Sequence, residues 1–237
     1  MSADAPGATA GHGHNIGTQT ESSLHSALKL RVSQPGDRFE VLMGGFVVDV
    51  VRGDTLIEIQ TGGFAAMGRK LDHLLGDHHV HIVHPIAVDS WIERFDKPRR
   101  KSPKHGCLHD IFGELVSVPT LLDHPNLTIE VFLVQVDVVK VADPAMRRRR
   151  GGWRTVDRRL LDVVAQHGLR TPDDLAAMLP ERLPGEWTTR DLAEQAAIPR
   201  RTAQQMAYVL KANELVTEVR RDRAGAHYVT PGLPGAS

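Results

Sequence analysis

The sequence predicts an α/β protein with a second, smaller and mainly helical domain, and two observations lead to this prediction. Strand-like apolar segments alternate with helical patterns in the first 143 residues. A segment with a proline, four consecutive arginines and a Gly-Gly pair, typical of a linker, then precedes a region of mostly helical patterns. We therefore expect a disordered tail over residues 1–20, an α/β domain over 21–143, a basic linker over 144–154 and a C-terminal domain over 155–237.

The α/β region follows the order helix, three strands, helix, strand. Apolar residues at helical spacing predict helices, and runs of aliphatic residues between turn residues predict strands. The expected elements are helices over 21–32 and 63–75 and strands over 38–43, 46–51, 55–60 and 79–86. A loop rich in charge, a short helix from Leu108 and a long strand from Leu127 complete this region.

The C-terminal region is predicted to contain four helices and two strands. Helices are expected around residues 156–166 and 172–178. Thr188 or Thr189 caps a third helix, and Pro199 stands at the first position of a fourth helix that runs to about Ala212. Two short strands, over 215–219 and 226–230, are joined by the basic turn RRDRAG.

Composition excludes several classes of protein. Apolar residues make up 41% and charged residues 24% of the chain, which is typical of a soluble globular protein. The first twenty residues lack the features of a signal peptide, and no run of about 18 apolar residues predicts a membrane span. The single cysteine, Cys107, excludes an internal disulfide and a cysteine-based zinc cluster. We expect a cytoplasmic protein without a membrane partner.

The net charge of zero conceals an asymmetry along the chain. Residues 147–237 contain 16 basic and 11 acidic side chains, and the remaining residues contain 13 basic and 18 acidic ones. The C-terminal part therefore carries a charge of +5 and the N-terminal part a charge of −5. A basic module of this kind suits a polyanionic partner such as DNA.

Two adjacent predicted strands carry carboxylates among aliphatic residues. Asp49 lies within VVDVV, and Glu58 lies two residues before Gln60 in LIEIQ. A buried carboxylate without a partner costs several kcal/mol, roughly, so converging carboxylates indicate a bound divalent cation. Mg²⁺ binds one or two carboxylates together with waters and phosphate oxygens, and it can activate a water for phosphodiester hydrolysis. The alternative is a set of structural salt bridges to Arg52, Arg69 or Lys70.

The spacing of Asp49, Glu58 and Gln60, within this order of elements, resembles the PD-(D/E)XK nuclease superfamily over roughly residues 21–85. The resemblance implies a restriction-endonuclease-like αβββαβ core, Mg²⁺ or Mn²⁺ held by Asp49 and Glu58, and cleavage of DNA. Gln60 stands where lysine is usual and can orient a water only by hydrogen bonding. Lys70 is the candidate for the missing positive charge, and Glu21 matches a position where some members have a third acid.

The C-terminal segment resembles a winged helix-turn-helix, and this resemblance implies contacts with DNA. The start of the fourth helix would enter the major groove, and the basic turn would contact phosphates. The implied DNA-binding residues are Arg200, Arg201, Gln204, Gln205, Arg220, Arg221 and Arg223. A winged helix that binds protein is the alternative.

Three other features carry weaker signals. The basic loop with Arg99, Arg100, Lys101 and Lys104 is either a solvated loop or a phosphate-binding one. His79 and His81 share a strand face, but their spacing fixes no third ligand for zinc, which favours a non-metal role. Asp110 and Glu114 lie one helical turn apart, where a polar helix face is favoured over a second carboxylate pair.

These patterns favour a magnesium-dependent DNA endonuclease that is targeted by a winged-helix domain. The alternative is a non-catalytic DNA-binding protein or regulator with a degenerate nuclease fold, which Gln60 favours. Many nucleases of this superfamily dimerise to cut both strands, so a homodimer is compatible with the first interpretation. The two-domain layout also resembles an uncharacterised bacterial family, which implies no activity.

Overall fold

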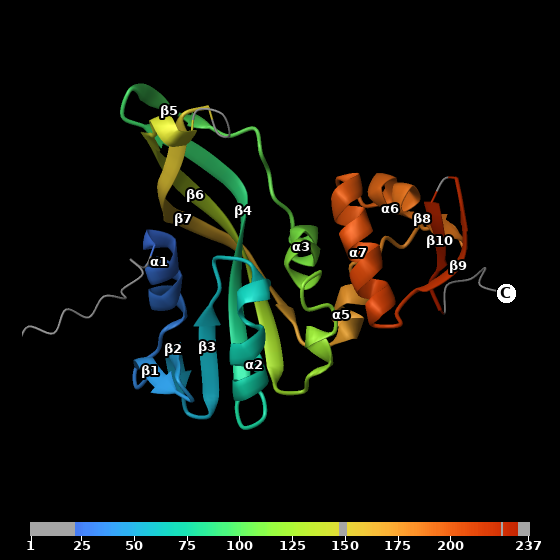
Figure 1. Ribbon diagram of the computed structural model, residues 1–237, viewed down its shortest axis with the longest axis horizontal. Coiled ribbons are helices and arrows are strands. Elements are labelled where there is room, and N and C mark those ends of the chain that lie inside the picture. The colour runs from blue at the N-terminus through green and yellow to red at the C-terminus, as the bar shows by residue number, and fades with distance from the viewer. Residues whose placement is uncertain (1–21, 147–150, 224, 232–237) are drawn as a thin grey trace, which may run out of the picture.

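The computed structural model describes residues 22–146, 151–223 and 225–231 of the chain (Figure 1). Within these residues the fold is mixed α/β. One seven-stranded mixed sheet forms the larger part, and a three-stranded sheet with helices forms the smaller part. The predicted tail and Glu21 lie outside the described residues.

The larger part contains the predicted order of helix, three strands, helix and strand, which the structure confirms. Short 3-10 turns over Phe64–Ala66, Leu108–Asp110, Leu121–Asp123 and Pro144–Met146 lie between the main elements. These are α1 (Ser23–Val32), β1 (Arg38–Met43), β2 (Phe46–Arg52), β3 (Thr55–Ile59), α2 (Gly68–Leu74), β4 (His79–Arg94), β5 (Lys97–Lys101), α3 (Ile111–Leu115), β6 (Leu127–Ala142) and β7 (Trp153–Leu169).

The large sheet has the strand order β1-β2-β3-β4-β6-β7, and β5 pairs with the far end of β4. β1, β2 and β3 are antiparallel to one another, whereas β3, β4 and β6 are mutually parallel. β7 is antiparallel to β6 along nearly its whole length. The segment expected to be a charged loop therefore contains strand β5, and β4 is longer than predicted.

The helix predicted over residues 156–166 is wrong, because this segment lies within strand β7. The pairing runs from Ile129–Leu169 to Ala142–Trp153 and contains three register shifts. Each β-bulge inserts an extra residue and shifts the alternation of faces, so the apolar spacing imitates a helix. The assignment of residues 155–169 to the C-terminal domain is corrected accordingly, since they form an edge of the large sheet.

The two faces of the large sheet are covered by different helices. Leu24 and Leu28 of α1 pack on one face, against residues such as Ile57 and Phe132. α2 and α3 cover the other face together with Phe64, and this second core is the larger one. The site described below lies where α1 and α2 approach β2 and β3 from opposite faces.

The smaller part consists of three helices and three short strands in the described residues. Their order is α5 (Pro172–Ala176), β8 (Trp187–Thr188), α6 (Thr189–Gln195), α7 (Arg200–Ala212), β9 (Thr217–Asp222) and β10 (Gly225–Val229). The sheet order is β8-β10-β9, with antiparallel pairs. Thr188 caps α6 through its side chain, as predicted, and α7 begins directly after Pro199.

The larger and smaller parts share one hydrophobic core. Phe112 of α3 and Met206 of α7 belong to the same buried cluster. Asn213 donates a hydrogen bond to the Pro119 carbonyl at 2.8 Å across this contact. Figure 1 shows α3 beside α7. No helix in the described part of the chain is long and apolar enough to cross a membrane.

Candidate active site

The backbone pairing between β2 and β3 ends just before the two predicted acids, Asp49 and Glu58. The ladder's last pair beyond the turn is Val50–Ile57. One residue further, Asp49 Oδ2 accepts a hydrogen bond from the Ile59 backbone N–H at 2.8 Å. The carboxylate thus replaces a backbone carbonyl as the acceptor, and it is fixed in the opening between the strands.

A histidine that the sequence analysis did not select holds the other side of Asp49. His25 Nε2 lies 3.2 Å from Asp49 Oδ2. Burial raises the pKa of Asp49, but the hydrogen bonds from His25 and from the Ile59 amide lower it by more, so the pKa lies below its usual value. The available signal was the position of His25 beside Leu24, on the helix face that docks on the sheet.

Glu58 is buried, with 6% of its surface exposed, and it forms an ion pair with Lys70 of α2. The distance from Lys70 Nζ to Glu58 Oε1 is 2.6 Å, and Lys70 also donates to the Val47 carbonyl at 2.6 Å. Burial raises the pKa of Glu58 to about 7, with a contribution from the negative charge of Asp49, although Lys70 lowers it. The two acids therefore lie close enough to repel one another.

The side chain of Gln60 is held by the turn that follows β3. Its Nε2 donates to the Gly63 carbonyl at 2.8 Å, and its backbone carbonyl lies 2.7 Å from His84 Nδ1. Burial lowers the pKa of His84, which favours the neutral imidazole. Glu114 Oε2 accepts from the Phe64 amide at 3.3 Å in the same region.

Two carboxylates are a suitable donor set for Mg²⁺, which commonly keeps several waters. No three His, Cys, Asp or Glu side chains in the described residues are grouped so that they could hold a metal ion by themselves. An ion bound to Asp49 and Glu58 would therefore take its other ligands from water or from a substrate. Lys70 would have to release Glu58, since it now neutralises that carboxylate.

The salt-bridge alternative from the sequence is correct for one pair. Lys70 binds Glu58, whereas Arg52 pairs with Asp37 at 2.7 Å instead of binding either acid. Asp49 is held by an imidazole that the alternative did not include. The structure thus brings Asp49, Glu58 and Lys70 together.

The other weak candidates have structural partners. His79 Nε2 lies 3.1 Å from Thr128 Oγ1, and His81 Nε2 lies 3.0 Å from Glu130 Oε2. Asp110 accepts a hydrogen bond from the Cys107 amide at 3.1 Å, which fits the polar helix face favoured from the sequence.

The predicted DNA-binding residues of α7 lie in two different environments. Arg200, Arg201 and Gln204 are exposed. Gln205 lies instead against α3, where a Cβ added to Gly113 would be 3.6 Å from its amide. α7 therefore offers only part of the predicted surface to a partner.

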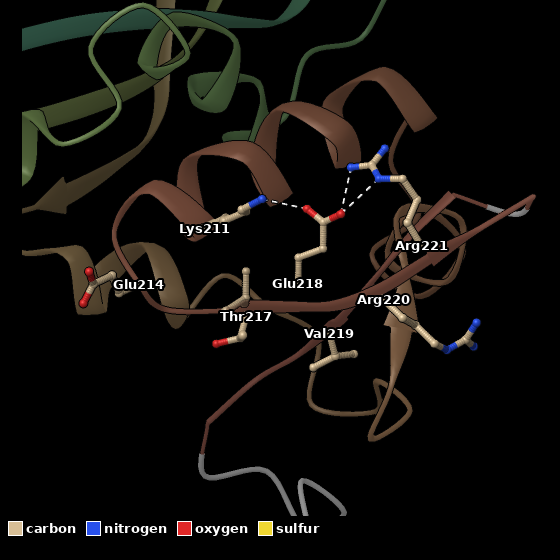
Figure 2. A pocket seen from close by; sticks show the side chains of 8 residues that line it. Lys211, Glu214, Thr217, Glu218, Val219, Arg220 and Arg221 are labelled. Carbon is tan, nitrogen blue, oxygen red and sulfur yellow. Dashed lines mark hydrogen bonds and ion pairs between the residues drawn. The ribbon is translucent and has the colours of Figure 1, made fainter.

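The basic turn between β9 and β10 is largely neutralised by acids of the same domain. Arg220 pairs with Glu186 and with Asp222, the latter at 2.6 Å. Figure 2 shows Arg221 and Lys211 meeting Glu218 from two sides, at 2.8 and 2.6 Å. These side chains line a hollow of about 640 Å³ beside β9. Arg223 is exposed.

The basic residues around β5 are also placed by specific contacts. Arg99 pairs with Asp137 at 2.7 Å, and Lys101 pairs with Asp89 at 2.9 Å. Arg100 is exposed. Lys104 lines a groove of about 290 Å³ that also includes Thr61, the residue after Gln60.

Residues 22–170 match a family described as a domain of unknown function, DUF8091. The chain belongs to this family. The DUF8091 match covers α1 to β7 and ends before α5, so it coincides with the large sheet and its helices. An uncharacterised protein of Treponema pallidum (strain Nichols) is 36% identical over 185 residues, which cover 76% of this chain and 74% of that protein. No solved structure matches the chain.

Proposed function

We propose that this protein is a Mg²⁺- or Mn²⁺-dependent DNA endonuclease of the PD-(D/E)XK type. The observation that carries the proposal is the meeting of Asp49, Glu58 and Lys70 at the opening between β2 and β3. The order of α1, β1, β2, β3, α2 and β4 supports it, because the PD-(D/E)XK core has this order. The negative charges of the partly buried Asp49 and the buried Glu58 repel one another, and a cation would relieve this repulsion.

In this proposal Asp49 and Glu58 hold the ion, which would stabilise charge on the scissile phosphate and lower the pKa of a bound water. His25 and the Ile59 amide keep Asp49 ionised and fix its orientation. Lys70 moves from Glu58 to the substrate phosphate, where its positive charge takes the place of the usual motif lysine. Gln60 orients the attacking water by hydrogen bonding.

We further propose that the smaller part is a winged helix that binds DNA. The order α5, β8, α6, α7, β9 and β10, with β10 between β8 and β9, supports this assignment because winged helices have this arrangement. Arg201, Gln204 and the half-exposed Tyr208 share one face of α7 at helical spacing and would enter the major groove.

A non-catalytic DNA-binding protein is the second candidate. Two observations favour it: Lys70 already neutralises Glu58, and the Gln60 amide is bound to Gly63. In such a protein the cluster would serve only to hold α2 on the sheet.

The deciding experiment compares Asp49→Ala and Glu58→Ala with the parent on duplex, single-stranded and branched DNA, with Mg²⁺ or Mn²⁺. We expect both variants to lose cleavage and to keep DNA affinity. Asp54→Ala is the matched control, because Asp54 is an exposed acid in the turn between the same strands. A parent that binds DNA but cuts none of the substrates would establish the second candidate.

A further inference from the structure

The hairpin of β4 and β5 presents a single large apolar side chain at its tip. Arg94 pairs with Lys97, which leaves Phe95 and Asp96 as a two-residue turn. Phe95 is fully exposed, at 106% of its reference surface. Two-residue hairpin turns favour Asn-Gly, Asp-Gly or Gly-Gly for backbone reasons. Neither turn geometry nor core packing therefore accounts for a phenylalanine here.

The hairpin beneath Phe95 is strongly basic. All five residues of β5 are exposed, and four of them are Lys or Arg. Within the described residues, neither Lys97 nor Arg100 lies within ion-pair distance of a carboxylate. Lys97 lies next to the tip and Arg100 lies three residues further along β5, and both charges are available to an anionic partner.

Other cations of the hairpin fix it on the sheet. The guanidinium of Arg99 stacks over Trp91, with 4.8 Å between them, and also pairs with Asp137. The guanidinium of Arg94 stacks over Trp153 of β7 at 4.3 Å. Each cation–π contact is a net attraction between the guanidinium and the ring, so the tip is carried on an ordered support. An ordered support lowers the entropic cost of using Phe95 in binding.

We propose that the β4–β5 hairpin is a wedge for duplex DNA, in which Phe95 inserts between base pairs and Lys97 and Arg100 contact the adjacent phosphates. This inference rests on the proposed function for its DNA partner. Apolar wedges flanked by cations are used in this way to unstack a base step and kink the duplex. The proposal assigns a role to the one fully exposed aromatic ring among the described residues.

A bound duplex is long enough to reach from Asp49 and Glu58 to the tip of the β4–β5 hairpin. β3 ends level with Val83 of β4, and Phe95 follows twelve residues later along the same strand. At about 3.3 Å per residue, the tip lies at most roughly 40 Å beyond the end of β3. This length corresponds to about 12 base pairs. Figure 1 shows β5 at the end of the long strands, well beyond β3.

Charge and area favour DNA over a lipid surface as the partner. One phenylalanine buries about 150–250 Å². Stable membrane anchoring requires more than one apolar or lipid anchor. A base step, in contrast, accepts one aromatic ring, and adjacent phosphates match Lys97 and Arg100.

The test measures binding of the full-length protein to a duplex that carries 2-aminopurine, with a chelator present so that no cleavage occurs. The parent should raise the 2-aminopurine fluorescence and bend the duplex, as measured by energy transfer between its ends. Phe95→Ala should lose both signals and bind about tenfold more weakly, with an unchanged salt dependence. Phe39→Ala is the matched control, because Phe39 is a half-exposed phenylalanine on β1 at another edge of the sheet.

The double variant Lys97→Ala/Arg100→Ala separates the charges from the ring. It should lower the slope of log affinity against log salt by about 0.9 for each phosphate that the variant no longer neutralises. Equal DNA affinity and bending in Phe95→Ala and the parent would overturn the proposal. The proposal would also be overturned if Phe95→Ala lost binding to phosphatidylserine vesicles but kept binding to DNA, because that result would identify a membrane contact. If the parent gives the fluorescence and bending signals but cleaves no DNA, only the proposed nuclease activity is contradicted, because these binding measurements need no catalysis.

Discussion

At the scale of single residues, the site depends on how two carboxylates are charged. Asp49 has two hydrogen-bond donors and a lowered pKa, whereas the more deeply buried Glu58 has a pKa of about 7. The folded protein therefore stabilises the ionised form of Asp49, and it retains a proton on Glu58 to a higher pH than an ordinary glutamate would. Opposite shifts in adjacent carboxylates are common in functional sites, because neighbouring groups are arranged there to set protonation.

This pair predicts a specific pH dependence of stability in the metal-free protein. A folded pKa of about 7, above the ordinary glutamate value of 4.5, means that protons bind the folded state more tightly. The stability contributed by protonated Glu58 is complete below pH 4.5 and is lost as the pH rises through 7.

Glu58→Gln removes this titration. Relative to the parent, it should therefore gain about 2–3 kcal/mol in the free energy of unfolding between pH 5 and pH 8. Chemical denaturation at both pH values, with a chelator, checks the difference, and Asp54→Asn provides the control. A difference between variant and parent that does not change with pH would show that Glu58 is not buried as described.

At the scale of elements, α1 controls the geometry of the site because it carries His25. Leu28 is fully buried against the sheet, whereas Leu30, two residues later, is 78% exposed. By residue type alone the leucines of this helix are equivalent. Docking on the sheet buries Leu24 and Leu28 and leaves Leu30 exposed.

Leu28→Ala should lower the free energy of unfolding by about 2–5 kcal/mol, because it leaves a cavity between α1 and the sheet. Leu30→Ala on the same helix should change it by less than about 0.5 kcal/mol. Thermal denaturation of both variants measures the contrast. Equal losses in the two variants would mean that α1 does not dock through Leu28.

At the scale of the whole molecule, α7 has to serve two surfaces. One of its faces packs on α3 within the shared core, and the other is exposed. This packing fixes the proposed recognition helix relative to the acids of the large sheet. In the proposed function, DNA would therefore meet both parts at once, and a cut would fall at a constant distance from the recognised bases.

Gln204 and Gln205 test this arrangement because they are adjacent and chemically identical. Gln204→Ala should weaken DNA binding by about fivefold or more, since a good base contact contributes about 1–3 kcal/mol. Gln205→Ala should leave affinity unchanged, because this side chain lies against Gly113. Fluorescence anisotropy with labelled duplex measures both. A larger loss for Gln205→Ala would mean that α7 leaves α3 when DNA binds.

The sequence by itself determined most of the elements and the position of the two acids. Strands β1, β2 and β3 and helices α6 and α7 follow local patterns of apolar spacing, turns and caps, and these patterns act over a few residues. Asp49 and Glu58 could be selected because a charge within an aliphatic run is costly wherever that run is buried. The resemblance to nucleases adds an expectation of chemistry, which stays a prediction.

Only the tertiary structure decided the features that depend on distant residues. Pairing with β6 makes residues 153–169 a strand. The sequence did not indicate this strand, because bulges interrupt the alternation of apolar and polar residues along it. The docking of α1 brought His25 to Asp49, over 24 positions of sequence, and packing on α3 removed Gln205 from the exposed surface. Such contacts join segments that are far apart in the chain, and local sequence patterns do not encode them. They form because the segments pack together in the folded protein.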